Sequence, residues 1–304
     1  MTRPPFPAVL DSSIMSAVRS CHKKAELEYL WHYKPKGQSV HLVAGGAFAA
    51  GMEAARTAFW VDQASADDAC ALGLEALVKH YGDFECPPDS AKSLERTCGA
   101  FEFALSVFPL GEDGTEPILL PSGKRGIEFS FAHPLPIPNP ETGDPILYCG
   151  RMDQIISYQS AGIFIEDDKT TSQLGASWAN QWHLRSQFTG YAWGCREAGI
   201  PVKGVLVRGV SILKTKYDKA EALTYRPDWQ IDRWYEQLLR DIKRLVNAWR
   251  EGYYDYSLDH ACTEYGGCPF KQVCLVQDGT NWLEQFYERR EWNPLTRTET
   301  KVAA

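Results

Sequence analysis

The feature that most constrains the fold is a predicted β-hairpin over residues 150–171. Two β-like runs flank a polar turn segment, so they are expected to pair as antiparallel strands that turn at Ser160. In that register Asp153 lies directly opposite Asp167, with Cβ atoms roughly 4.5–5.5 Å apart. Carboxylates this close repel each other unless one takes a proton or a cation lies between them. The hairpin therefore predicts a cation site built from Asp153 and Asp167.

The residues after Asp167 extend this predicted site. Side chains alternate along a strand, so Lys169 is expected on the same face as Asp167, and Asp168 on the opposite face. Carboxylate oxygens suit Mg²⁺ or Mn²⁺, and a neighbouring ammonium group can stabilise charge that develops on a phosphate. Glu128, in the predicted strand 126–131, is either a third carboxylate of the site or a solvent-facing strand residue. The pattern favours metal-dependent hydrolysis of a phosphodiester.

The length and net charge of the chain limit the kinds of protein that could carry out this chemistry. The chain has 304 residues, which is long for one domain and short for two. We expect an α/β core at 110–225, with helical regions at 1–109 and 226–304. The net charge of −7 argues against a protein that merely coats nucleic acid, although carboxylates at a metal site add negative charge themselves. No run approaches the roughly 20 apolar residues of a membrane span, and no secretory signal pattern begins the chain, so a cytoplasmic protein with reduced cysteines is expected.

Hydrophobic periodicity predicts several helices around the hairpin. They cover residues 14–33, 47–81 with a break near 63–67, 90–108, 177–198 and 227–251. Small residues between Ala47 and Ala55 predict tight packing of the second helix against another element. A β-like run at 202–210 indicates a strand that is added through a crossover, and hence a mixed sheet. Gln187 and Tyr191 share one face of a helix, where they form either a surface pair or contacts for a nucleotide.

A second chemical feature is the cysteine trio Cys262, Cys268 and Cys274, spaced as C-x5-C-x5-C. Regularly spaced thiolates in one loop are good ligands for a soft metal site, either an iron–sulfur cluster or zinc. A fourth ligand is expected from His260 or Cys21, and Cys21 would tie the N-terminal helix to the C-terminal region. The alternative is a set of reduced cysteines without metal.

Taken together, these features resemble the RecB-type branch of the PD-(D/E)XK nuclease superfamily, in particular iron–sulfur exonucleases of the CRISPR-associated and AddB kind and their phage relatives. The Gly-Arg-Met-Asp run at 150–153 is similar to the G-R-x-D motif of that branch, and the Asp-Asp-Lys-Thr run at 167–170 to its D-x-K-T motif. Gln187 and Tyr191 match its Q-x3-Y helix motif, and Cys21 followed by the late trio matches its split four-cysteine cluster. The resemblance covers most of the chain.

The resemblance implies a restriction-endonuclease-like mixed β-sheet and the hydrolysis of DNA, single-stranded or at duplex ends, by an exonuclease rather than an endonuclease. It implies that Asp153 and Asp167 hold the divalent ion, that the Asp168 backbone carbonyl is a further ligand, and that Lys169 acts at the attacking water. The Gln–Tyr pair would position the DNA strand.

The resemblance also implies a [4Fe-4S] cluster, rather than zinc, held by Cys21, Cys262, Cys268 and Cys274. A helicase or a recombination protein is an implied partner, and any unwinding would have to come from that other chain because no nucleotide-binding phosphate loop occurs here.

Two positions depart from the pattern of the family. Ala49 stands where the second helix commonly carries a metal-binding histidine, so Glu53, Glu128 or a single-metal mechanism would have to compensate. The cysteine spacing also differs from the familiar C-x2-C-x5-C. Two alternatives therefore stand beside an active nuclease: a catalytically weak nuclease-fold protein that binds DNA or a recombination or replication partner, and a zinc-stapled enzyme with unrelated chemistry.

Overall fold

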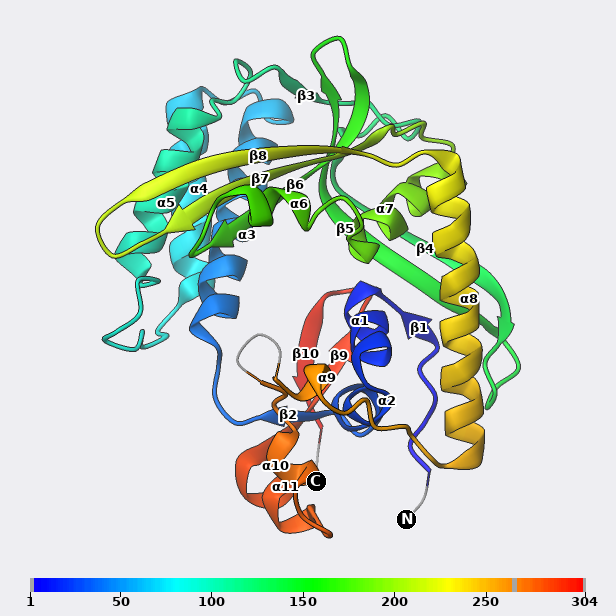
Figure 1. The fold of residues 1–304 in the computed structure, drawn as a ribbon. Coiled ribbons are helices and arrows are strands. Elements are labelled where there is room, and N and C mark those ends of the chain that lie inside the picture. Colours follow the sequence, from blue (N-terminus) through cyan, green and yellow to red (C-terminus); the bar gives the residue numbers. More distant parts are fainter. Residues whose placement is uncertain (1–2, 264–266, 303–304) are drawn as a thin grey trace. The chain divides into compact units, whose positions relative to one another are not determined.

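The computed structural model of the protein describes residues 3–263 and 267–302 (Figure 1). They fall into two compact units. One, here called the hairpin unit, comprises 38–130 and 151–231, and the other, the terminal unit, comprises 1–37, 131–150 and 232–304. The sequence suggested a different kind of division, into a core at 110–225 and helical regions at 1–109 and 226–304. That division stays a prediction.

The predicted hairpin organises the sheet of the hairpin unit. β5 (Pro145–Tyr158) pairs antiparallel with β6 (Gly162–Thr171), and Gln154 lies opposite Glu166 as a turn at Ser160 requires. β7 (Gly204–Ile212) runs parallel to β6, which confirms the crossover, and β8 (Tyr217–Tyr225) runs antiparallel to β7. The short β3 (Thr115–Pro117) pairs with β5, and β4 (Ile127–Pro138) begins one residue after the start of the strand expected at 126–131 and extends seven residues beyond its end. The expected mixed sheet is confirmed.

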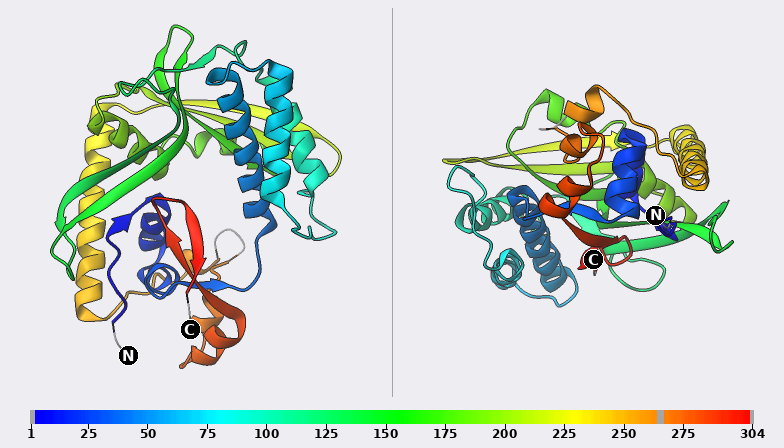
Figure 2. Two further views of the ribbon diagram at one scale, coloured as in Figure 1. Left: turned by 180° about the vertical axis from the view of Figure 1, so that it is seen from behind. Right: turned by 90° about the horizontal axis from the view of Figure 1, so that it is seen from below.

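Three helices form one layer of the hairpin unit (Figures 1 and 2). They are α3 (Val40–Trp60), α4 (Ala66–Tyr81) and α5 (Leu94–Val107). A break expected near residues 63–67 is present between Trp60 and Ala66, but α3 begins seven residues before the predicted start at Ala47. Gly51 and Gly73 allow α3 and α4 to approach closely, since a Cβ atom on Gly73 would lie only 2.8 Å from the Gly51 carbonyl oxygen. This contact confirms the tight packing predicted for the small residues.

The helix expected at 177–198 is two helices, α6 (Ala176–Asn180) and α7 (Ser186–Glu197). The single helix was a wrong prediction, and the reason lies in long-range contacts. The chain turns between the two helices, and the guanidinium of the buried Arg226 donates to the carbonyl oxygen of Trp182 at 2.5 Å. That carbonyl therefore needs no partner within a continuous helix. Gly199, with φ of 74°, ends α7 as expected.

The helix expected at 14–33 is also interrupted. The structure has α1 (Ser12–Ser20), capped by the Asp11 carboxylate, then α2 (His22–Ala25), and then a π-helical turn η1 (Glu26–Leu30). Between α1 and α2 the backbone of Cys21 is extended, with φ of −165° and ψ of 122°. Cys21 therefore lies at a helix boundary and not inside a helix, which corrects the sequence prediction.

The terminal unit brings both ends of the chain together. The predicted long helix is α8 (Asp228–Glu251), and Arg19 of α1 pairs with its Asp241 at 2.7 Å. β2 (Tyr33–Pro35) pairs with β9 (Tyr287–Asn293), which pairs with β10 (Thr298–Lys301), while β1 (Val9–Leu10) pairs with β5. The remaining helices are the short α9 (His260–Thr263), α10 (Lys271–Cys274) and α11 (Thr280–Phe286). None of the helices in the described part of the chain is long and apolar enough to cross a membrane.

Candidate functional site

The candidate site is centred on the two carboxylates of the β5–β6 hairpin. The backbone N–H of Asp168 donates to Asp153 Oδ2 at 2.9 Å, and Lys169 Nζ donates to Asp167 Oδ2. Asp167 is only 2 % exposed, and this burial raises its pKa to about 7; Lys169 acts against the shift, whereas Asp153 adds to it. Burial alone would lower the pKa of Lys169, but Asp167 and Asp153 raise it, so the amine stays protonated. The structure thus brings together the three residues that the hairpin register singled out.

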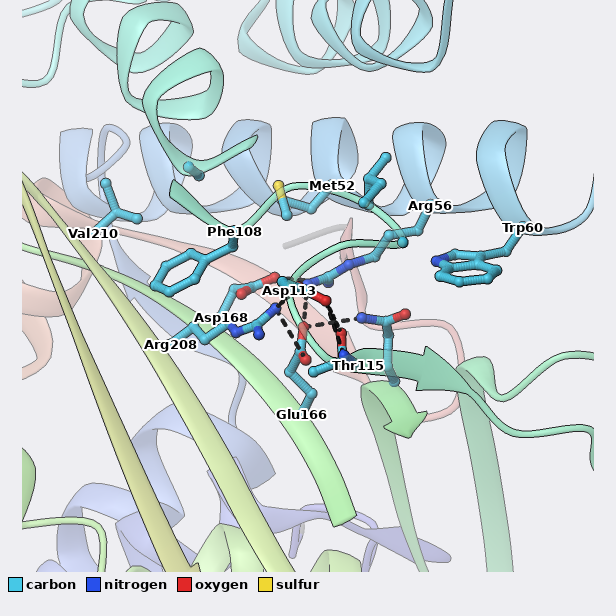
Figure 3. Close-up of a pocket in the computed structure, with 14 residues that line it drawn as sticks. Met52, Arg56, Trp60, Phe108, Asp113, Thr115, Glu166, Asp168, Arg208 and Val210 are labelled. Carbon is cyan, nitrogen blue, oxygen red and sulfur yellow. Dashed lines mark hydrogen bonds and ion pairs between the residues drawn. The ribbon is translucent and has the colours of Figure 1, made fainter. Parts of the chain in front are cut away.

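Asp168 faces away from this group, as the strand alternation predicted. Its carboxylate pairs with Arg56 of α3 at 2.7 Å, and the same guanidinium pairs with Glu166 at 2.5 Å (Figure 3). Gln154 donates to Glu166 at 2.9 Å, and Arg208 of β7 contributes a further ion pair to Glu166 at 3.3 Å. All of these side chains are buried, so the reverse face of β6 carries a network of ion pairs within the protein interior.

The sequence patterns did not predict this network of ion pairs. Glu166 and Asp168 alternate with Asp167 and Lys169, and two carboxylates on the buried face of a strand require cations. That requirement was the available signal, but it does not identify Arg56 or Arg208, because both lie far away in the sequence.

Glu128 and Glu53 lie near the site and share one arginine. Arg151, from the Gly-Arg-Met-Asp run, donates through Nε to Glu128, and its Nη2 lies 3.1 Å from both carboxylate oxygens of Glu53. Burial and then the charge of Asp153 raise the pKa of Glu128 to about 7, although Arg151 lowers it. The Glu128 backbone has φ of 52°, a left-handed conformation that is rare for a non-glycine residue. Ala49 is exposed one helical turn before Glu53.

The Gln–Tyr pair lies on α7. Gln187 Nε2 donates to Tyr191 Oη at 2.9 Å, as expected for residues that share a helix face. Lys169 Nζ lies 5.8 Å from the centroid of the Phe188 ring, so α7 passes beside the lysine of the candidate site. The predicted catalytic residues therefore all belong to the hairpin unit.

The four candidate cluster cysteines all belong to the terminal unit. Cys21 Sγ accepts from the backbone N–H of Ser257 at 3.5 Å, and Cys262 Sγ lies 3.9 Å from the Ser257 carbonyl oxygen. The Cys268 N–H donates to the Cys262 carbonyl at 3.2 Å. Burial raises the pKa of the Cys274 thiol, and the neighbouring Cys268, Cys21 and Cys262 raise it further. His260, the other candidate fourth ligand, is exposed on α9.

Neither set of side chains is closed around a metal position. Within residues 3–263 and 267–302, no group of three or more His, Cys, Asp or Glu residues is arranged to hold a metal ion. The donor types nevertheless fit the expected groups. Asp153 and Asp167 are hard oxygen donors whose mutual repulsion a divalent cation would relieve, and four thiols are the ligand set of an iron–sulfur cluster or of zinc.

Comparison with known proteins identifies a family for this chain. A sequence model of the PD-(D/E)XK nuclease superfamily matches residues 13–275. The crystal structure of a protein named "Putative exonuclease" from Eubacterium rectale is similar with a TM-score of 0.50 at 14% identity, over 84% of this chain and 87% of that one. The crystal structure of SSO0001 gives a TM-score of 0.32 at 12% identity, over 75% and 82% of the two chains. No curated protein matches this chain.

Proposed function

Because the chain belongs to the PD-(D/E)XK nuclease superfamily, we propose that it is a Mg²⁺- or Mn²⁺-dependent DNA exonuclease of the RecB-like kind. The observation that carries this proposal is the juxtaposition of Asp153, Asp167 and Lys169 on one face of the β5–β6 hairpin. Two facing carboxylates and a protonated lysine form a site for an anionic, metal-bound substrate such as a phosphodiester.

Asp153 and Asp167 would hold the ion, together with the Asp168 backbone carbonyl. When bound, a divalent ion polarises the scissile phosphate and lowers the pKa of a coordinated water. Lys169 would orient that water or stabilise negative charge on the phosphorane; its contact with Asp167 and its protonated state support this role. The pKa of Asp167 near 7 means that a metal ion would compete with one proton for this carboxylate.

The other predicted site residues have supporting roles in the proposal. Gln187 and Tyr191 would position the DNA strand through the amide and hydroxyl groups that now bond to each other. Glu128 would be a further metal ligand, or a carboxylate that Arg151 holds at the edge of the site. A helicase or recombination partner and a cytoplasmic location belong to the same proposal.

We also propose that Cys21, Cys262, Cys268 and Cys274 hold a [4Fe-4S] cluster. The support is that segments from both ends of the chain bring these thiols into one unit, where Cys21 and Cys262 both contact Ser257. Such a cluster would link the N-terminal and C-terminal segments and would stabilise the fold of the terminal unit. Metal and sulfide analysis of anaerobically purified protein tests this, since stoichiometric zinc without sulfide would exclude the cluster.

The test of the nuclease proposal is the degradation of labelled single-stranded and blunt duplex DNA in the presence of Mn²⁺. Asp153→Ala, Asp167→Ala and Lys169→Ala are expected to abolish hydrolysis while the protein stays folded. Asp218→Ala and Lys216→Ala serve as matched controls, because both residues are exposed and lie at the start of β8 in the same unit. Wild-type hydrolysis by all three site variants would refute the assignment.

A second candidate function is DNA binding with little or no hydrolysis. The observation that favours it is Ala49, which supplies no ligand where the family commonly has a histidine. DNA binding by the wild-type protein without cleavage in Mg²⁺ or Mn²⁺ would support this second candidate over the first.

A further inference from the structure

The terminal unit contains a cavity of about 710 Å³ that has no role in the proposed hydrolysis, and Cys274 of the proposed cluster is one of its lining residues. This volume lies within the roughly 300–1,000 Å³ of typical ligand pockets. Its lining residues come from the segments 3–4, 23–33, 252–256 and 273–283. Four of the lining side chains are aromatic, namely Trp31, Tyr33, Tyr254 and Tyr256. The cavity is therefore large enough, and sufficiently rich in aromatic rings, to hold a planar group.

One wall of this cavity is the π-helical turn η1. Glu26 and Leu27 of η1 line the cavity, as does Trp31, whose backbone N–H donates to the Glu26 carbonyl at 2.9 Å. The next residue, His32, has φ of 63°, which is uncommon for a non-glycine residue. π-Helical turns are rare and occur frequently at functional sites. The irregular backbone of η1 and the residue that follows it thus border the cavity, and Glu26 and Trp31 both line it.

A buried hydroxyl supplies an independent indication of a ligand. Tyr254 lines the cavity and is 5 % exposed, yet its Oη has no hydrogen-bond partner in the described part of the protein. A buried hydroxyl without a partner destabilises the folded protein, because it has lost its hydrogen bonds to water. A ligand with a polar edge would supply the missing partner.

The charged groups of the cavity specify the ligand further. Lys23 pairs with Glu26 at 2.6 Å, and its Nζ lies 6.0 Å from the centroid of the Tyr256 ring. Arg3 adds a second cation, held by a hydrogen bond to the Arg250 carbonyl at 2.8 Å. Two cations and one carboxylate leave an excess of positive charge, which suits a ligand that joins an aromatic ring to an anionic group.

We propose that this cavity binds an unpaired nucleotide of single-stranded DNA, with the base among the aromatic rings and the phosphate near Lys23 and Arg3. Aromatic rings combined with cations are the common device for single-strand binding, because every base offers a π-face and every linkage a phosphate. The hydroxyl of Tyr254 would bond to the edge of the base. The inference rests on the proposed function in one respect: DNA is taken as the substrate of the chain.

The test measures DNA binding by the full-length protein without added divalent metal, so that no hydrolysis is required. Fluorescence anisotropy would compare the affinity of the protein for a labelled oligothymidylate of twelve nucleotides with its affinity for an abasic oligonucleotide of equal length. Tyr256→Ala removes a ring that is 46 % exposed, so the fold should tolerate the change. Loss of stacking on one aromatic side chain predicts roughly 5- to 150-fold weaker binding of the thymidylate. Binding of the abasic strand should not change.

Tyr253→Ala is the matched control. Tyr253 is 62 % exposed and lies three residues from Tyr256, but it does not line the cavity. Its removal should leave both affinities unchanged, and Tyr254→Phe, which keeps the ring, should weaken only the binding of the thymidylate. Equal affinities of Tyr253→Ala and Tyr256→Ala for the thymidylate would overturn the proposal. So would equally tight binding of both oligonucleotides by the wild-type protein, as expected if the cavity receives a protein segment instead.

The outcome is independent of the nuclease assay. Asp167→Ala should keep base-dependent binding while it loses hydrolysis. Base-dependent binding through Tyr256 in a protein that never cleaves DNA would contradict the proposed function but not this inference. Cleavage without base-dependent binding would contradict only this inference.

Discussion

Arg56 is expected to be indispensable for the stability of the hairpin unit. Its guanidinium, 3 % exposed, joins Glu166 at 2.5 Å and Asp168 at 2.7 Å (Figure 3). Arg56→Met removes the cation, keeps most of the side-chain volume, and leaves both carboxylates buried. Breaking a buried ion pair from one side costs about 3–5 kcal/mol. We therefore expect the free energy of unfolding at pH 8, measured by urea denaturation, to fall by about that amount.

The loss of unfolding free energy in Arg56→Met should depend on pH, because the protonation of the buried carboxylates depends on pH. Burial raises the pKa of Glu166 from 4.5 to about 7, while Arg56 and Arg208 lower it, so removal of Arg56 raises it further. A carboxyl group whose pKa is raised on folding contributes stability at low pH and loses it as the pH rises through the folded value. The destabilisation should therefore be smaller at pH 5, where Glu166 is protonated, than at pH 8.

A surface ion pair of the same unit provides the control. Arg125 pairs with Glu116 at 2.9 Å, and the two side chains are 30% and 57% exposed, far more than Arg56 and its partners. Arg125→Met should cost less than about 1 kcal/mol at either pH. If Arg56→Met were no more destabilising than Arg125→Met, or equally destabilising at pH 5 and pH 8, the stabilising role assigned to the buried network would be refuted.

Three further predictions concern the site and the packing around it. Without metal, Asp167→Asn should raise the melting temperature relative to the wild type more at pH 8 than at pH 5, because the raised pKa of Asp167 costs stability as the pH rises towards 7; differential scanning fluorimetry in chelator checks this. Gly73→Ala should destabilise the protein by about 1–3 kcal/mol, since the added Cβ meets the Gly51 carbonyl at 2.8 Å; an unchanged urea midpoint would contradict this packing. Ala49→His should lower the Mn²⁺ concentration needed for half-maximal hydrolysis, because it adds an imidazole one turn before Glu53; an unchanged metal titration would place Ala49 outside the metal site.

The hairpin could be predicted because local rules determine it. Alternation along a strand and one turn at Ser160 fix which residues face each other, and the observed register agrees. The partners of the buried carboxylates could not be predicted in this way. Arg56 is 110 residues from Glu166, and no local pattern links the two.

The helix boundaries that were predicted wrongly have the same explanation. Apolar periodicity continues through Cys21 and through residues 181–185, but long-range contacts interrupt both helices. The carbonyl of Trp182 bonds to Arg226, and Cys21 contacts the distant residues Asp255 and Ser257 through its sulfur. The strands β8, β9 and β10 were likewise not expected, because their pairing partners lie in other parts of the chain.

The central claim is that Asp153 and Asp167 bind a divalent ion that DNA hydrolysis requires. The most direct test is a Mn²⁺ titration of DNA hydrolysis by the wild-type protein and by Asp167→Asn, which preserves the shape of the side chain and removes its charge. We predict saturable, Mn²⁺-dependent hydrolysis by the wild type and no hydrolysis above the chelator control by a folded Asp167→Asn. Hydrolysis by Asp167→Asn at the wild-type rate, with the same dependence on Mn²⁺, would contradict the claim.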